Sequence, residues 1–307
     1  MKIASIDIGS NTVLLLIAEI SKPNKELTPL LNEYRIPRIS EGLEKSHVIS
    51  DKKVEELIKI LDEYQIIINS FNCDHIIVNA TNAFRIATNA DQIMDLIIDS
   101  FKLNVNVLSG FDEAYLSFLG ARSSFTSTRD IFVLDIGGGS TEIIYGDDKS
   151  IIYRKSFNRG AVNFTEELIN KYPINRKYLK SVSEQINKYF AEIRTIKDSS
   201  DTLISVAGTP TSLSCINKNI TTYDDDLIEG SILTQEEIVK IIYEMSPLHP
   251  QEILSKYGSI VEGREDVILT GSIILSEVMS LLDIKKTVVS SRGLRYGAVI
   301  KFIEDLQ

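Results

Sequence analysis

Cysteine is scarce in this sequence, and so are the side chains of the common transition-metal sites. The two cysteines, Cys73 and Cys215, form no Cys-x-x-Cys pair, which argues against a disulfide framework and predicts free, mostly buried thiols. The three histidines, His47, His75 and His249, are scattered and stand outside every motif, which argues against a histidine metal site.

Several other features are missing. No Gly-x-Gly-x-x-Gly fingerprint and no Gly-Lys-Ser/Thr phosphate loop occurs, so neither a dinucleotide fold nor a P-loop is indicated. No stretch approaches the ~20 apolar residues of a membrane span, and the first residues read directly as a strand, so we expect a cytoplasmic protein without a membrane partner. The formal net charge of −10 argues against a general nucleic-acid surface.

The chain is long enough for two domains. It has 307 residues, of which 43% are hydrophobic and 25% charged, the balance of a soluble globular protein.

Strand patterns alternate with helical ones, which predicts an α/β fold. Asn89 is expected to cap a helix whose apolar face includes Ile93, Leu96 and Ile97. The expected strands are 2–8, 13–20, 27–36, 75–79, 105–108, 151–157, 202–206 and 286–289, and residues 131–142 are expected to form a strand, a turn and a second strand. The expected helices include 51–64, 89–102, 160–171, 174–197, 234–245, 249–257 and 270–283.

Residues 131–142, IFVLDIGGGSTE, are the most informative stretch. An apolar run closed by glycines predicts a buried strand that enters a tight turn. Glycine tolerates positive φ and allows close approach to a ligand, and exposed turn amides suit phosphate oxygens. Asp135 and Glu142 flank the turn and are the hard oxygen ligands that Mg²⁺ prefers. The candidate phosphate-binding residues are Gly137, Gly138, Gly139, Ser140 and Thr141. An ordinary hairpin with a glycine-rich turn is the alternative.

A second copy of the pattern stands near the N-terminus. Residues 3–12, IASIDIGSNT, repeat the apolar strand, the Asp-Ile-Gly triplet and the small polar residues after it. Ser10, Asn11 and Thr12 are therefore candidate substrate-binding residues, and Asp7 matches Asp135 as a candidate metal ligand. Such repetition constrains the whole fold and predicts two related lobes facing a shared cleft.

This pair of loops resembles the phosphate-binding loops of the actin-like ATPase superfamily. More closely, the chain resembles the exopolyphosphatase/guanosine pentaphosphate phosphatase family, whose signature the IDIGSNT and DIGGGSTE stretches match. Further matches follow in the expected order along nearly the whole chain. They are ATNAFR at 80–85, SGFDEAYLSFLG at 109–120, AGTPTSL at 207–213 and RGLRYG at 292–297.

The resemblance implies two actin-like (ribonuclease H-like) lobes, expected at 1–125 and 126–294, with their boundary near 121–130. A C-terminal helix at about 295–307 is expected to pack back on the first lobe. The implied activity is Mg²⁺-assisted release of terminal orthophosphate from inorganic polyphosphate by water. Guanosine pentaphosphate hydrolysis is the alternative within the class, and an actin-like ATPase or sugar kinase is the alternative outside it. A homodimer is a further expectation.

Glu113 matches the family's catalytic glutamate, and a positioned carboxylate can deprotonate an attacking water. Without the family, Asp112 and Glu113 would be read as first-turn residues that favour the helix dipole. Glu142 is the second catalytic candidate. Arg85 closes the 80–85 motif, and its guanidinium can hold a phosphate through two hydrogen bonds. Arg38, Arg264, Arg292 and Arg295 are weaker candidates that can equally form surface ion pairs.

Two further positions complete the expectations. Gly208 and Thr209 open a predicted helix, whose N-terminus is a natural anion site for another phosphate of a long substrate. Tyr296 occupies a position where the family usually carries glutamate, so the resemblance gives no role for it.

Overall fold

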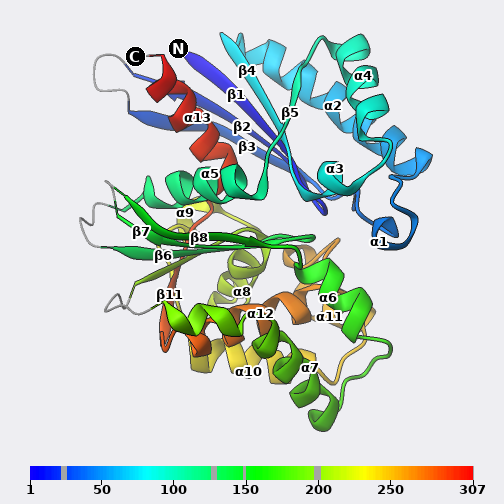
Figure 1. Ribbon diagram of the computed structural model, residues 1–307, viewed down its shortest axis with the longest axis vertical. Helices are drawn as coiled ribbons and strands as arrows, with labels where there is room; N and C mark the ends of the chain where they lie inside the picture. Colours follow the sequence, from blue (N-terminus) through cyan, green and yellow to red (C-terminus); the bar gives the residue numbers. More distant parts are fainter. Residues whose placement is uncertain (22–25, 126–129, 148–149, 197–201, 307) are drawn as a thin grey trace. The chain divides into compact units, whose positions relative to one another are not determined.

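The computed structural model describes residues 1–21, 26–125, 130–147, 150–196 and 202–306. These residues form two compact units (Figure 1). Unit 1 comprises Met1–Ser123 together with Arg292–Gln307, and unit 2 comprises Ser124–Ser291. Part of the segment in which the sequence places the boundary, residues 126–129, lies outside the described residues.

Unit 1 contains a five-stranded sheet with the order β3-β2-β1-β4-β5. Strand β1 pairs antiparallel with β2 and parallel with β4, so the sheet is mixed. The strands are β1 (Lys2–Ile8), β2 (Val13–Ile20), β3 (Leu27–Arg35), β4 (His75–Ala80) and β5 (Val105–Val107). The helices are α1 (Leu43–Ser46), α2 (Asp51–Phe71), α3 (Asn82–Ile86), α4 (Ala90–Phe101), α5 (Gly110–Arg122) and α13 (Leu294–Asp305).

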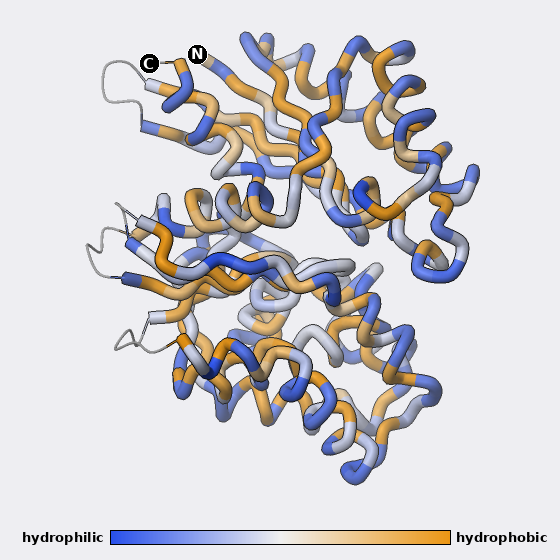
Figure 2. Tube along the Cα trace, viewed as in Figure 1, coloured by the Kyte–Doolittle hydropathy of each residue, from blue (hydrophilic) through white to orange (hydrophobic). Residues whose placement is uncertain are grey.

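Alternation along β1 sends its side chains into two cores. Ala4, Ile6 and Ile8 belong to the core on the side of α2 and α4. Ile3 belongs to the core that includes Tyr296 and other residues of α13. Figure 2 shows the resulting apolar stretches along the strands. The sheet of unit 1 is therefore covered by helices on both faces, and the C-terminal helix packs on the sheet of the N-terminal strands (Figure 1).

Unit 2 contains a six-stranded sheet with the order β10-β11-β9-β6-β7-β8. Its strands are β6 (Ile131–Ile136), β7 (Thr141–Gly146), β8 (Ile151–Phe157), β9 (Leu203–Val206), β10 (Ile232–Thr234) and β11 (Lys286–Val289). Its helices are α6 (Ala161–Leu168), α7 (Arg176–Tyr189), η1 (Ala191–Thr195), α8 (Gly208–Lys218), α9 (Asp225–Ile228), α10 (Gln235–Met245), α11 (Pro250–Tyr257), η2 (Gly258–Ile260) and α12 (Ile268–Leu281).

The two sheets have the same connectivity over five strands. An antiparallel meander, β1-β2-β3 or β6-β7-β8, is followed by a parallel neighbour of its first strand, β4 or β9. A fifth strand, β5 or β11, extends the parallel part. The predicted fold class, α/β with two related units, is confirmed, and β10 is an addition at the edge of the second sheet.

Some local predictions were wrong. Asn89 does occupy the N-cap position of α4, but its side chain makes no capping bond and instead pairs with both backbone groups of Ile49. Leu96, expected on the buried face, is exposed. The single helix expected over 174–197 is divided into α7 and η1, and residue 197 lies outside the described range.

The cysteines and the helices bear on two further expectations. Both cysteines are free thiols, and burial raises the pKa of Cys215 to about 11, whereas Cys73 is half-buried. Among the helices of the described residues, none combines the length and the apolar character needed to span a membrane.

Candidate active site

The two Asp-Ile-Gly stretches form hairpins with the same geometry. The amide of Gly9 donates to the carbonyl of Thr12 at 2.9 Å, and the amide of Gly137 donates to the carbonyl of Ser140 at 3.0 Å. Each turn therefore has two residues at its tip, Ser10 and Asn11 in unit 1 and Gly138 and Gly139 in unit 2.

The strand registers show where the two hairpins differ. Asp135 lies directly opposite Glu142 across β6 and β7. Asp7 lies opposite Leu14 in the equivalent pair of β1 and β2. Directly opposite residues share one face of a sheet with their Cβ atoms ~5 Å apart. The hairpin of unit 2 thus presents two carboxylates side by side, whereas that of unit 1 presents one carboxylate and a leucine.

Each turn is held by its carbonyl groups. In unit 1 the carbonyls of Ser10 and Asn11 accept from the amides of Ser40 and Arg38, at 2.9 and 3.1 Å. Arg38 has a left-handed φ of 53° at this contact. The Ser10 hydroxyl is buried and has no hydrogen-bond partner among the described residues. A buried donor of this kind fits an anionic ligand oxygen.

The first residues of α6 hold the turn of unit 2. The amides of Ala161 and Val162 donate to the carbonyls of Gly137 and Gly138, both at 2.9 Å. Neither Gly138 nor Gly139 donates its own amide to an acceptor within the described part of the chain. Carbonyls anchored on one side and unused amides are the arrangement of an anion-binding turn.

Close approach, rather than backbone conformation, accounts for glycine in this region. None of the glycines at 137, 138 and 139 has a left-handed φ, contrary to one reason the sequence suggested for them. A Cβ on Gly160, the residue before α6, would lie 2.4 Å from the Gly137 carbonyl oxygen. The turn and α6 can therefore meet only because residue 160 lacks a side chain.

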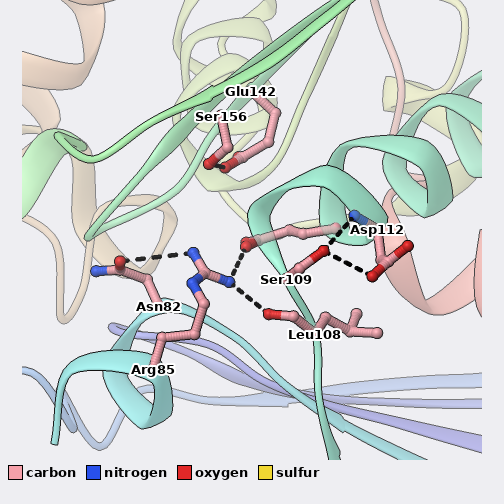
Figure 3. Close-up of polar contacts among 8 residues, drawn as sticks. Asn82, Arg85, Leu108, Ser109, Asp112, Glu142 and Ser156 are labelled. Carbon is pink, nitrogen blue, oxygen red and sulfur yellow. Dashed lines mark hydrogen bonds and ion pairs between the residues drawn. The ribbon is translucent and has the colours of Figure 1, made fainter.

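The acidic pair at the start of α5 is separated by the structure. Ser109 is the N-cap, and its hydroxyl accepts from the amide of Asp112 and donates to its carboxylate, at 3.1 and 2.6 Å (Figure 3). Asp112 is exposed and lies in the first turn of the helix. Glu113, the next residue, is only 7% exposed and points elsewhere. A buried carboxylate needs a partner.

That partner is Arg85, from the short helix α3. Its Nη1 atom donates to Glu113 Oε2 at 2.6 Å and to the carbonyl of Leu108 at 2.9 Å. Figure 3 shows the guanidinium directed toward Leu108 on one side and Asn82 on the other, where Nη2 lies 3.5 Å from Asn82 Oδ1. Two candidates that the sequence assigned separately, as phosphate ligand and as base, thus form one ion pair in unit 1.

Glu142 is almost fully buried, at 1% exposure, and its Oε1 accepts from the hydroxyl of Ser156 on β8 at 2.6 Å (Figure 3). Its neighbour across the hairpin, Asp135, is half-buried, as is Asp7 in unit 1. The Thr141 hydroxyl donates to the carbonyl of Arg159 at 2.8 Å. Within the residues that the structure describes, no three His, Cys, Asp or Glu side chains are grouped as a metal site.

Gly208 and Thr209 lie in the first turn of α8, as predicted. The preceding Ala207 has a φ of 78°, a conformation that side chains rarely adopt. A Cβ on Gly208 would lie 2.0 Å from Arg264 Nη1, so a guanidinium rests against the start of this helix. Arg264 thus lies next to Gly208, one of the predicted substrate-binding residues.

The C-terminal motif is built into unit 1. Tyr296 is buried, and its hydroxyl accepts from Asn32 Nδ2 at 2.9 Å. Arg295 donates through Nε to Asn32 Oδ1 at 3.2 Å. The guanidinium carbons of Arg292 and Arg295 lie 5.4 and 5.3 Å from the centre of the Tyr296 ring. Cation–π contacts and an amide hydrogen bond therefore surround the tyrosine.

Sequence patterns could not reveal several of these partners. Ser156, the carbonyl of Leu108 and the amides of residues 38 and 40 act through contacts between segments far apart in the chain. The pairing of Asp135 with Glu142 across the hairpin could have been inferred from the sequence, because a two-residue turn fixes the register of its hairpin.

Two units of one α/β topology, each with a glycine-containing hairpin turn at the head of its sheet, define the structural class of this chain. The model of the Ppx/GppA phosphatase family matches residues 16–305. The chain belongs to the Ppx/GppA phosphatase family.

Individual relatives agree with this placement. The chain is 33% identical to the bifunctional 3-dehydroquinate synthase/phosphatase of Fusobacterium nucleatum over 98% of its own length, and spans 46% of that longer protein. It is 26% identical to exopolyphosphatase 2 of Mycobacterium tuberculosis, covering 90% of this chain and 89% of that protein. The Aquifex aeolicus Ppx/GppA family member has a similar solved structure, with a TM-score of 0.85, 29% identity, and coverage of 100% of this chain and 99% of that one.

Proposed function

We propose that this protein is a Mg²⁺-dependent hydrolase that releases terminal orthophosphate from inorganic polyphosphate. The observation that carries the proposal is the buried carboxylate of Glu113, held at 2.6 Å by Arg85 in a family of phosphatases. The mycobacterial relatives named exopolyphosphatase support the choice of substrate class.

In the proposed reaction, a water oxygen attacks the terminal phosphorus, and the bond from that phosphorus to the bridging oxygen breaks. Glu113 takes the proton of the attacking water, and the shortened chain leaves with the bridging oxygen. Glu142 is the second candidate for orienting the water. Each unit carries one of the repeated turns, and both turns are proposed phosphate-binding groups.

The groups that hold phosphate are the two turns and the hydroxyl and amide groups beside them. The unused amides of Gly138 and Gly139 and the buried Ser10 hydroxyl support this assignment. Arg85 adds positive charge. The remaining proposed contacts come from Asn11, Thr12, Gly137, Ser140, Thr141, Gly208 and Thr209.

Mg²⁺ is proposed to be held by Asp135 and Glu142, with Asp7 contributing from the first hairpin. The donor set fits this ion, because Mg²⁺ is commonly bound by one or two carboxylates and completes its shell with water and substrate phosphate. When bound, the ion would neutralise negative charge on the phosphoryl oxygens.

Guanosine pentaphosphate is the alternative substrate, because it presents the same terminal phosphoanhydride. The test is phosphate release from long polyphosphate, short polyphosphate, guanosine pentaphosphate and ATP, measured in parallel with Mg²⁺ and with a chelator. The proposal expects the fastest release from polyphosphate and its loss with the chelator. Preferred release from guanosine pentaphosphate would move the assignment to the alternative, and release from ATP alone would contradict both.

A further inference from the structure

Arg85 is anchored by the protein before any ligand is present. Its helix, α3, starts directly after β4, and its Nη1 reaches the carbonyl of Leu108, which follows the neighbouring strand β5. The guanidinium therefore spans the ends of two adjacent parallel strands. A side chain tied to backbone at its charged end has a fixed position rather than a mobile one.

The same nitrogen atom also holds Glu113. A guanidinium Nη carries two hydrogens, and those of Nη1 are directed to Leu108 at 2.9 Å and to Glu113 at 2.6 Å. The second distance is at the short end for a charge-assisted bond. One arginine nitrogen thus connects the Glu113 carboxylate to the backbone at the end of β5.

Burial makes this contact energetically important. The side chains of Arg85 and Glu113 are 19% and 10% exposed, so solvent screens the pair far less than a surface pair. Removing Arg85 takes away the cation that lies 2.6 Å from this buried carboxylate. The remaining carboxylate would then move toward water or take up a proton, and either change would spoil it as a base.

We propose that Arg85 is a positioning residue for Glu113, so that its main contribution to turnover passes through that carboxylate rather than through phosphate binding. This inference rests on the proposed function, in which Glu113 is the base. The contact of Nη2 with Asn82 Oδ1 is long, at 3.5 Å, so the guanidinium keeps N–H donors for a phosphate oxygen as well. The proposal concerns which of the two contacts sets the rate.

A double-mutant cycle separates the two contributions, because residues that act through one another are not additive. Arg85→Gln should lower kcat by a factor on the order of 10² in the wild-type background, with a much smaller change in KM. In the Glu113→Gln background, the same substitution should lower kcat by less than about threefold. An equal loss in both backgrounds, or a loss confined to KM, would overturn the positioning role.

Two controls accompany the cycle. Asn82→Ala removes the weak third contact of Arg85 without touching Glu113 and should change kcat by less than about threefold. Arg85→Lys keeps the charge but not the planar fork, and should restore part of the loss. If circular dichroism shows that Arg85→Gln does not fold, the cycle is run with Arg85→Lys. A loss in kcat that is larger in the wild-type background than in Glu113→Gln then supports the positioning role, and an equal loss overturns it.

A readout without turnover keeps this inference apart from the proposed function. Carbon-13 NMR of the Glu113 carboxyl group should show it taking up its proton at higher pH in Arg85→Gln than in the wild type, because the neighbouring cation is lost. An unchanged titration would contradict the positioning role. Wild-type protein that releases no phosphate from any substrate would instead contradict the proposed function, and the NMR comparison would still decide this point.

Discussion

The side chains expected to do chemistry are each fixed by one or two polar neighbours within their own unit. Glu142 accepts from Ser156 at 2.6 Å, and Glu113 accepts from Arg85 at the same distance. Such partners orient a carboxylate and are commonly worth 10- to 100-fold in metal affinity or activity (a rough range). The neighbour of Glu142, Ser156, therefore predicts an effect at a position that no sequence motif contains.

Ser156→Ala tests this at the hairpin of unit 2. Removal of the hydroxyl deprives Glu142 of its donor, so we expect Mg²⁺ affinity in the presence of substrate, and turnover, to fall by roughly 10-fold or more. Isothermal calorimetry and phosphate release measure the two quantities. Ser150→Ala, at an exposed serine that bonds Asp147 near the start of β8, should leave both unchanged. Equal effects of the two substitutions would show that Ser156 does not orient Glu142.

At the scale of elements, the C-terminal motif of the sequence is explained by packing. A Cβ on Gly297 of α13 would lie 1.8 Å from the carbonyl oxygen of Leu116 in α5, and one on Gly120 would lie 2.1 Å from that of Gly293. The two helices can cross at this distance only without side chains at these positions. The glycines of the motif thus hold α13 against α5, in addition to any role of its arginines.

Gly297→Ala should destabilise unit 1 by about 3 kcal/mol or more, since the obstacle is backbone of a packed helix. Denaturant unfolding measures the change. Gly42→Ala is a matched control, because its Cβ would meet open space and only its φ of +73° is unfavourable, at a cost of ~1–2 kcal/mol. A Gly297→Ala protein as stable as the Gly42→Ala protein would mean that the helices do not approach this closely.

A capping box gives a pH dependence at the same scale. At the start of α10, Glu237 accepts from the amide of Thr234 at 2.8 Å, and this bond lowers the pKa of Glu237 below its ordinary value of 4.5. A depressed pKa in the folded state contributes stability above pH 4.5 that is lost as the pH falls through the folded value. The unfolding free energy of Glu237→Gln should therefore fall less steeply below that pH than that of the wild type. Parallel acid profiles would contradict the assignment.

The sequence predicted elements better than contacts. The positions of β1, β2, β6 and β7 followed from apolar runs and their turns, and those runs carry a strong local signal. Asn89 was misjudged because its partner, Ile49, is remote in sequence, so a local capping rule competed with a tertiary hydrogen bond and lost. The pairing of Arg85 with Glu113 was missed for the same reason, although both residues stood in recognised motifs.

At the scale of the molecule, charge is the dominant feature. The chain carries 43 acidic and 33 basic residues, a net charge of −10, and its proposed substrate is a polyanion. A few local groups, such as the turn amides and Arg85, must therefore overcome an unfavourable long-range field. Tyr296 fits this picture locally, because the guanidinium groups of Arg292 and Arg295 lie against its ring in a position where a carboxylate would neutralise them.

Association should accordingly speed up when salt screens the long-range repulsion. Raising ionic strength from about 0.01 to about 0.1 M shortens the Debye length from ~30 to ~10 Å. At constant Mg²⁺ and saturating metal, kcat/KM for polyphosphate should rise over this range while kcat stays nearly constant. A steady fall in kcat/KM would instead show that a positive local field steers the substrate.

The most direct test of the account compares Glu113→Gln with Asp112→Asn. Glu113 and Asp112 are adjacent in sequence but differ in environment. Glu113 is buried and accepts from Arg85, whereas Asp112 is exposed and accepts from the Ser109 hydroxyl. We expect Glu113→Gln to lower the rate of phosphate release by a factor on the order of 10² to 10⁴, with substrate affinity kept or increased. Asp112→Asn should cost less than about threefold, apart from a small loss of helix stability. Equal, mild losses in the two variants would contradict the assignment of Glu113 as the base.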